Sequence, residues 1–127
     1  YMDGGLADSI PIEYALEKGN DKIVVVLTRN PGYRKKRAVK ATEQLYKRAY
    51  KKYPNLVRTI MTRNAVYNKQ MKLIEKLEEE GKIFVIRPLI PTVSRMEKDY
   101  DKLQHFYMHG NRLMKKEYQG LLEYLNE

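Results

Sequence analysis

Asp3 is the residue whose type and neighbours most clearly allow chemistry, because Gly4 and Gly5 follow it directly. Two adjacent glycines permit positive φ and the close approach of a ligand or of another backbone segment. A carboxylate on such an open turn can point at a neighbouring group. An isolated Asp-Gly-Gly is also common in ordinary surface turns, so the residues that follow must decide between the two interpretations.

His105 and His109 form a second candidate pair, four residues apart in a segment expected to be helical. This spacing can place two zinc ligands on one helix face, but the metalloprotease form needs Glu after the first His, where this chain has Phe106. No third ligand is apparent, so we expect neither a metal nor a cofactor and interpret both histidines as polar flanks of a packing helix. Three acidic residues are expected to serve as cap, turn and helix-surface residues rather than acid catalysts: Asp8, Asp21 and Glu13.

A long basic segment between Arg29 and Lys72 contains Glu43 as its single acidic residue, with tyrosines interleaved as in LYKRAYKKYP. Three interpretations remain open. It can be a solvated helix face, a surface for an anionic membrane with tyrosines at headgroup level, or a nucleic-acid contact. Nucleic acid is the least expected of the three, because the chain has no helix-turn-helix, RNA-binding or zinc-finger signature.

Length and composition narrow the class of protein. The 127 residues suffice for one domain, and the formal net charge of +9 directs attention to anionic partners. The absence of cysteine excludes disulfides and thiolate chemistry and is compatible with a reducing compartment. No apolar run approaches the roughly 20 residues of a membrane span, and no signal peptide is visible. We expect a cytoplasmic protein, with peripheral membrane contact as an open alternative.

Hydrophobic periodicity predicts a mixed α/β chain. The expected elements are helices at 11–18, 37–53 and 55–80, strands at 22–28 and 83–87, and two helices within 96–125 that meet near Gly110. The order strand, helix, helix, strand is a βαβ unit, which implies two parallel strands. Both strands are apolar throughout and are therefore expected to be covered by helices on both faces. The helices of this chain can cover them only poorly, so we expect part of the sheet to lie outside it.

Four motifs follow one another in a fixed order at the start of the chain: Asp3-Gly4-Gly5, Asp8-Ser9-Ile10-Pro11, Gly19-Asn20-Asp21 and the apolar run Ile23 to Leu27. This set resembles the segment of patatin-like phospholipases that carries the acidic member of a Ser–Asp catalytic dyad. The tail, RMEKDYDKLQHFYMHGNRLMKKEYQGLLEYL, is similar to the helical ending of bacterial members.

The resemblance implies that Asp3 is the dyad base, supported on its turn by Gly4 and Gly5. The nucleophilic serine of a G-x-S-x-G elbow is absent, because Ser9 and Ser94 have no flanking glycine pair. The glycine-rich oxyanion loop of the family is absent from this sequence as well. The chain therefore resembles the C-terminal part of a lipid acyl hydrolase, inactive alone and completed by an N-terminal half.

The implied architecture is a three-layer α/β/α domain. Residues 1–90 are expected to form its C-terminal part, and residues 91–127 a helical appendage. In the loop after the first strand, Arg29, Arg34, Lys35 and Lys36 are expected to place an anionic headgroup near the active site. We also expect stability only as a homo-oligomer or beside the missing half. The alternative is a non-catalytic, tyrosine-rich basic module that binds an anionic membrane or nucleic acid.

Overall fold

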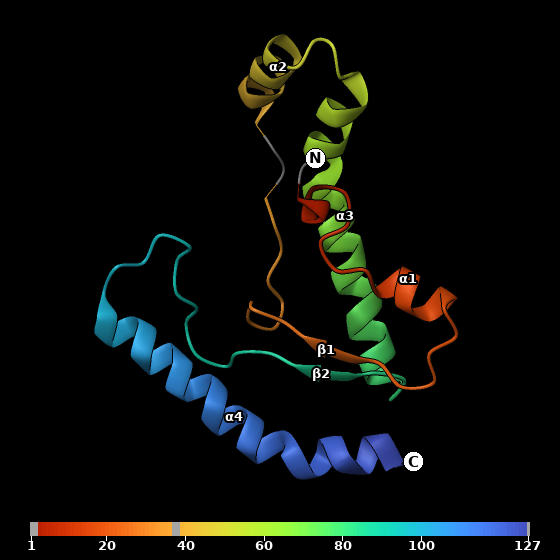
Figure 1. The fold of residues 1–127 in the computed structure, drawn as a ribbon, viewed down its shortest axis with the longest axis vertical. Coiled ribbons are helices and arrows are strands. Elements are labelled where there is room, and N and C mark those ends of the chain that lie inside the picture. Colours follow the sequence, from red (N-terminus) through yellow and green to blue (C-terminus); the bar gives the residue numbers. More distant parts are fainter. Residues whose placement is uncertain (1–2, 37–38, 127) are drawn as a thin grey trace. The chain divides into compact units, whose positions relative to one another are not determined.

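The computed structural model describes residues 3–36 and 39–126, which form two compact units. The first unit comprises Tyr1–Asn20 and Arg34–Lys76, and the second comprises Asp21–Tyr33 and Leu77–Glu127. In chain order the elements are the 3-10 turn η1 (Gly4–Leu6), α1 (Ile12–Glu17), β1 (Val24–Val26), α2 (Lys40–Ala49), α3 (Pro54–Glu79), β2 (Phe84–Ile86) and α4 (Tyr100–Asn126) (Figure 1). The chain is therefore mixed α/β, as predicted. None of the helices in the described residues is long and apolar enough to cross a membrane.

The first unit is built around α3, which begins at Pro54 because a proline is favoured at a first helical position. The helix predicted at 55–80 is confirmed, and its apolar stripe includes the fully buried side chains Met71 and Ile74. The other buried apolar residues of this unit are Ile12, Val57 and Tyr67. The stripe also contains Gln70, which is 3% exposed and which periodicity alone did not identify.

The helix predicted at 37–53 is shorter in the structure. Its predicted start, Arg37, lies outside the described residues, and Val39 is extended at φ −77° and ψ 143°. At the other end, Tyr50 leaves the helical conformation with φ −113° and ψ 37°. A turn follows because Pro54 disfavours the helical conformation for Tyr53, the residue before it.

The second unit contains a two-stranded parallel sheet, which confirms the predicted strand pairing. Val24, Val25 and Val26 lie opposite Phe84, Val85 and Ile86. Both strands are shorter than predicted, although flanking bonds from Leu27 N to Ile86 O (2.8 Å) and from Phe84 N to Ile23 O (3.0 Å) extend the ladder.

The strands are covered poorly within the described residues, as expected for the helices of this chain alone. Val25 is 8% exposed, but Val24 and Val26 on the opposite face are 40% and 70% exposed. The alternation follows from the period of two in a strand, and only one face is covered within the described residues. An exposed apolar face therefore remains on the sheet.

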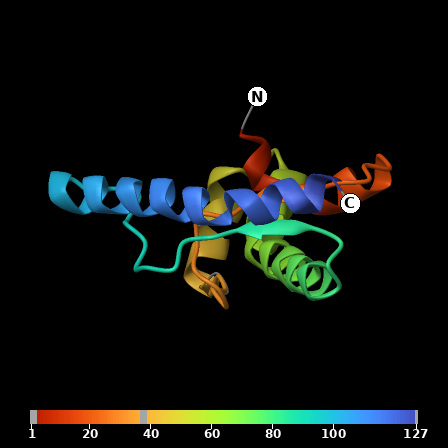
Figure 2. The same cartoon turned by 90° about the horizontal axis from the view of Figure 1, so that it is seen from below.

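α4 packs against β2, and Figure 2 shows the two elements from below. The rings of Phe84 and Tyr124 lie 5.8 Å apart between centroids. The Tyr124 hydroxyl accepts a hydrogen bond from Ile23 N at 2.9 Å and donates to Lys82 O at 3.1 Å. One side chain near the C-terminus thus connects the residues that precede both strands.

The prediction of two C-terminal helices meeting near Gly110 is wrong, because α4 is continuous from Tyr100 to Asn126. Gly110 does not have positive φ. A glycine inside a helix costs only about 1 kcal/mol relative to alanine, which is too little to end a helix of this length. The boundary predicted at residues 90 and 91 stays a prediction about the larger protein.

Candidate functional site

Asp3 caps the short turn η1 with its own side chain. Its Oδ1 accepts a hydrogen bond from Gly5 N at 2.8 Å, and its backbone oxygen accepts from Leu6 N at 3.1 Å. The residue is exposed. The carboxylate is therefore fixed at one oxygen while remaining accessible.

One of the two glycines, Gly5, lies directly against the Asp3 carboxylate. Neither Gly4 nor Gly5 has positive φ. A Cβ on Gly5 would lie 3.2 Å from Asp3 Oδ1, closer than most Cβ contacts, whereas a Cβ on Gly4 would meet nothing within 4 Å. Gly5 thus leaves room for the carboxylate to reach the backbone amide, and the turn needs small size rather than left-handed geometry.

The segment after Asp3 is attached to α3 by the buried Gln70. The Gln70 Nε2 group donates to the carboxylate of Asp8, and its Oε1 accepts from Ile10 N at 3.3 Å. Within the segment, Ser9 Oγ donates to Gly5 O at 2.9 Å. These contacts connect the Asp3 turn to a helix sixty residues later in the chain.

The roles predicted for the other carboxylates are partly corrected. Asp8 is not a helix cap: Pro11 occupies the N-cap of α1 without a side-chain bond, and Asp8 instead accepts from Gln70. Glu13 lies on the surface of α1, as predicted, and pairs with Lys69 at 2.7 Å. Asp21 lies in the bend that follows Gly19, whose φ is +69°.

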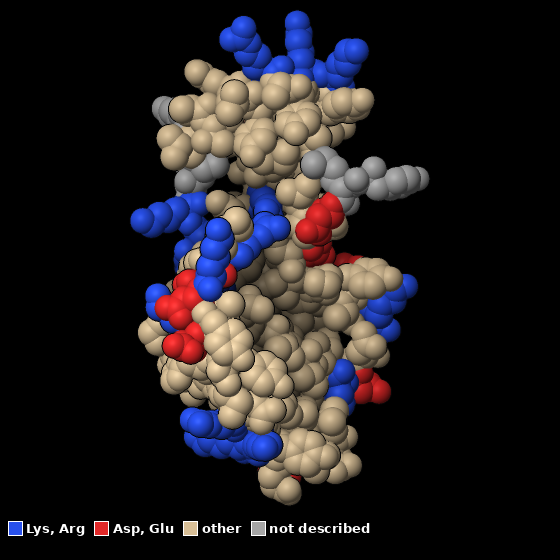
Figure 3. All heavy atoms as spheres, turned by 60° about the vertical axis from the view of Figure 1, so that its left-hand side comes forward, with Lys and Arg blue, Asp and Glu red and all other residues tan. Residues whose placement is uncertain are grey.

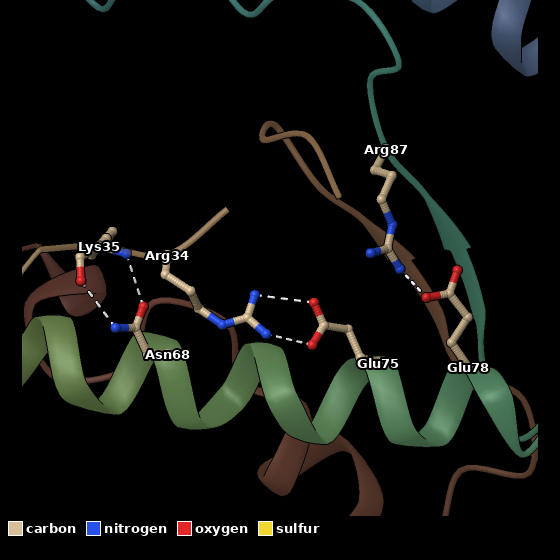
Figure 4. A network of polar contacts seen from close by, with 6 residues as sticks. All are labelled: Arg34, Lys35, Asn68, Glu75, Glu78 and Arg87. Carbon is tan, nitrogen blue, oxygen red and sulfur yellow. Dashed lines mark hydrogen bonds and ion pairs between the residues drawn. The ribbon is translucent and has the colours of Figure 1, made fainter. Parts of the chain in front are cut away.

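Two of the four predicted headgroup residues, Arg34 and Lys35, contact α3 within the first unit (Figure 4). Arg34 makes two hydrogen bonds with Glu75, one of 3.0 Å from Nη1 to Oε1. These bonds raise the pKa of Arg34, which is therefore firmly cationic and already paired. Lys35 exchanges backbone hydrogen bonds of 2.9 and 3.0 Å with the Asn68 side chain. Its ammonium group lies 4.0 Å from the centroid of Tyr67.

The remaining two candidates are held separately. Lys36 is exposed, and its backbone oxygen accepts from Asn64 Nδ2 at 2.7 Å. Arg29 belongs to the second unit, where its Nη1 donates to Thr92 Oγ1 at 3.1 Å and its guanidinium lies 5.1 Å from the centroid of Tyr33. The four residues are thus divided between two units, and their shared role at a headgroup stays a prediction.

A further surface lies on α2 and the first turns of α3. We define the α2 surface as the exposed residues Val39, Ala41, Leu45, Arg48, Ala49, Lys51, Lys52 and Arg58. Figure 3 shows a group of Lys and Arg side chains projecting outward at the top of the view. Beside the α2 surface is a groove of about 440 Å³ that includes Lys47, Tyr50, Val57 and Met61 in its lining.

The two histidines occupy different surroundings on α4. His109 Nε2 accepts a hydrogen bond from Leu89 N at 3.1 Å, whereas His105 is exposed beside the loop that contains Pro91. Within residues 3–36 and 39–126, no group of three metal-ligating side chains comes together.

Comparison with known proteins places part of the chain in a sequence family. Residues 53–126 match a family model described as a domain of unknown function (DUF6363). No curated protein sequence and no solved structure matches the chain. The matched residues include α3, β2 and α4, whereas Asp3 and α2 precede them.

Proposed function

The chain belongs to the family of DUF6363 domains, whose function is unknown. We propose from the residues of the chain itself that it is the C-terminal part of a patatin-like serine hydrolase that acts on lipid acyl esters. In this proposal Asp3 is the base of a Ser–Asp dyad. The nucleophilic serine and the oxyanion loop are supplied by the N-terminal half of the parent protein. No metal or other cofactor is required.

The observation that carries the proposal is the exposed carboxylate of Asp3, oriented by Gly5 N at 2.8 Å. It stands at the head of an ordered series of turn, helix, turn and apolar strand, which is the series that resembles the patatin-like segment. The hydrogen bonds of Gln70 with Asp8 and Ile10 anchor the segment that directly follows the turn. A general base must be positioned in this way before it can accept a proton efficiently.

The proposed chemistry follows from the pairing of a carboxylate with a serine. Asp3 accepts the hydroxyl proton while the serine oxygen attacks the ester carbonyl carbon. The tetrahedral intermediate collapses, protonated Asp3 returns its proton to the leaving alcohol, and an acyl-enzyme remains. Asp3 then accepts a proton from water, whose oxygen attacks the acyl-enzyme, and the carboxylic acid product is released as the serine is reprotonated.

The sheet supports a larger α/β/α parent domain. Val24 and Val26 are exposed on a parallel sheet, a sheet type that is normally covered by helices on both faces. A neighbouring strand and a further helical layer from the N-terminal half would cover them. The supported arrangement is therefore one in which this chain contributes an edge of the sheet and the dyad base.

The proposal is tested in the parent protein by replacing Asp3 with Asn, which conserves size and removes the proton acceptor. We expect ester hydrolysis to fall by at least about a thousandfold, as when other dyad or triad members are lost, with KM nearly unchanged. Asp21→Asn is the matched control, since Asp21 is also an exposed turn carboxylate. Circular dichroism establishes that both variants are folded.

Wild-type turnover in a folded Asp3→Asn variant would remove Asp3 from the mechanism and favour the alternative, a non-catalytic basic module. The sequence of the parent upstream of Tyr1 separates the same two functions. A G-x-S-x-G elbow between a strand and a helix supports the hydrolase, and its absence supports the module.

A further inference from the structure

The exposed side of α2 combines apolar and basic residues in an arrangement that the proposed chemistry does not use. Ala41, Leu45 and Ala49 recur at intervals of four, so they share one face of the helix, and all three are exposed. Leu45 is 66% exposed, and Val39 just before the helix is 68% exposed. This apolar stripe has no partner within the described residues.

Cationic side chains flank the stripe. Arg48, Lys51, Lys52 and Arg58 are exposed. The only acidic residue in this part of the chain, Glu43, is paired with Lys47 at 2.7 Å. The α2 surface therefore combines an exposed apolar stripe with a set of exposed cationic residues, the basic rim, and this combination complements an anionic boundary between water and hydrocarbon.

We propose that the α2 surface docks on membranes that contain anionic lipid, with Leu45 inserted among the acyl chains and the basic rim on the headgroups. A helix with an apolar stripe and a Lys/Arg-rich flank lies in the membrane interface, where apolar burial and charge attraction add. The long side chains of Lys51 and Lys52 can reach headgroups while α2 lies flat. This inference is independent of the role of Asp3.

A nucleic acid fits the same surface less well. Sequence-tolerant binding of single strands depends on aromatic faces that are free to stack with bases. Tyr46 and Tyr50 are half-buried and stack on each other with ring centroids 6.1 Å apart, so Tyr53, which is 62% exposed, is the one tyrosine of LYKRAYKKYP with a largely exposed ring. The exposed centre of the surface is instead Leu45, which offers no hydrogen bond to a base and no charge to a phosphate.

The first experiment measures flotation of the full chain with vesicles of phosphatidylcholine, alone or mixed with phosphatidylglycerol. We expect binding only to the mixed vesicles at low salt, and weaker binding as salt screens the charges. Leu45→Gln should weaken the association constant about tenfold, since burying a leucine is worth this much. Leu89→Gln is the matched control, because Leu89 is 62% exposed in the second unit and should bind as wild type.

The contribution of charge to vesicle binding is tested separately. The double substitution Lys51→Gln and Lys52→Gln should weaken binding about thirtyfold. The control is Lys115→Gln with Lys116→Gln, which removes the same charge from exposed positions of α4 and should change binding less than about threefold. Equal effects of the two double substitutions would overturn the proposal. Binding that is equally strong on neutral vesicles would also overturn it.

Fluorescence supplies a direct reading of insertion, because the chain contains no tryptophan. Leu45→Trp should show a blue shift on adding the mixed vesicles, while Leu89→Trp should show none. Three results would overturn the proposal: no shift at position 45, binding of a labelled single-stranded DNA oligonucleotide without vesicle binding, or a Leu45→Gln effect on oligomeric state by light scattering without an effect on flotation.

Discussion

The side chain of Gln70 donates to the carboxylate of Asp8, 62 residues earlier in the chain, and at the same time accepts from Ile10 N at 3.3 Å. One buried amide therefore satisfies a carboxylate and a backbone group of the segment that follows Asp3. Buried amides of this kind are costly unless both ends find partners. The pairing explains how a polar residue occupies the apolar stripe of α3, and it fixes the register of the segment on the helix.

Replacing Gln70 with Ala should lower the free energy of unfolding by about 1–3 kcal/mol, because the Ile10 amide loses its partner and a cavity remains. Urea unfolding measures the change. Gln104→Ala, at an exposed position of α4, should alter it by less than about 0.5 kcal/mol. Similar losses in the two variants would mean that the contacts of Gln70 do not hold the segment.

The Arg34–Glu75 pair should depend on the planar fork of arginine. Its side chains are 31% and 29% exposed, and Arg34→Lys keeps the charge but cannot make two parallel bonds. We expect a loss of about 1 kcal/mol in unfolding free energy. A double-mutant cycle with Glu75→Gln isolates the coupling, and the more exposed Lys69–Glu13 pair serves as control. Coupling no larger than in the control pair would contradict this prediction.

Stability should fall in acid partly through Asp99, next to the start of α4. Its Oδ1 accepts from Lys102 N at 3.2 Å and Asp101 N at 3.1 Å. The bond from the Lys102 amide is the main cause that lowers the pKa of Asp99. Because the folded pKa is depressed, this stabilisation is fully present above the unfolded value of about 3.9 and is lost as pH falls through the folded value.

Asp99→Asn should therefore have a lower Tm than the wild type at neutral pH, and the difference should shrink towards zero as the pH falls through the lowered pKa of Asp99 in the folded chain. Thermal unfolding followed by circular dichroism across pH gives the comparison. Asp101→Asn, in the first turn of the same helix, is the control for the removal of one negative charge from this end of α4. A difference in Tm that stays constant with pH would exclude the titration of Asp99 as its cause.

Gly110→Ala should stabilise the chain by about 1 kcal/mol, since a Cβ there meets nothing within 4 Å and alanine is the better helix former. Gly19→Ala should lower the free energy of unfolding by about 1 kcal/mol or more, because φ at Gly19 is +69°, a conformation that alanine disfavours. Chemical denaturation of the two variants measures both signs. Destabilisation by Gly110→Ala would argue against the continuity of α4.

The uncovered sheet face should make the isolated chain self-associate, as expected for exposed apolar strands. Val26→Lys places a charge at a position that is 70% exposed and should shift the chain towards monomer in light scattering. Thr28→Lys is the control beyond the end of β1. A wild-type chain that is a monodisperse monomer with cooperative thermal unfolding would contradict the expectation that it needs a partner.

The sequence by itself determined the kinds of elements and their order. The β-branched run at 22–28, the long stripe of α3 and the apolar run at 83–87 carry strong periodic signals, and the βαβ order leads directly to parallel pairing. Pro54 and Gly19 mark boundaries because their backbone preferences are local. Gly110 misled the prediction, since a weak local penalty is overcome by a long, otherwise favourable helix.

Only the tertiary structure decided which side chains meet. Gln70 reaches Asp8, Arg34 reaches Glu75, and Tyr124 binds the backbone of Ile23, across separations of 62, 41 and 101 residues. Such contacts depend on how distant elements pack, which no local pattern contains. For the same reason the sequence alone could identify Val24 and Val26 as strand residues but not their exposure, because burial depends on what covers the sheet.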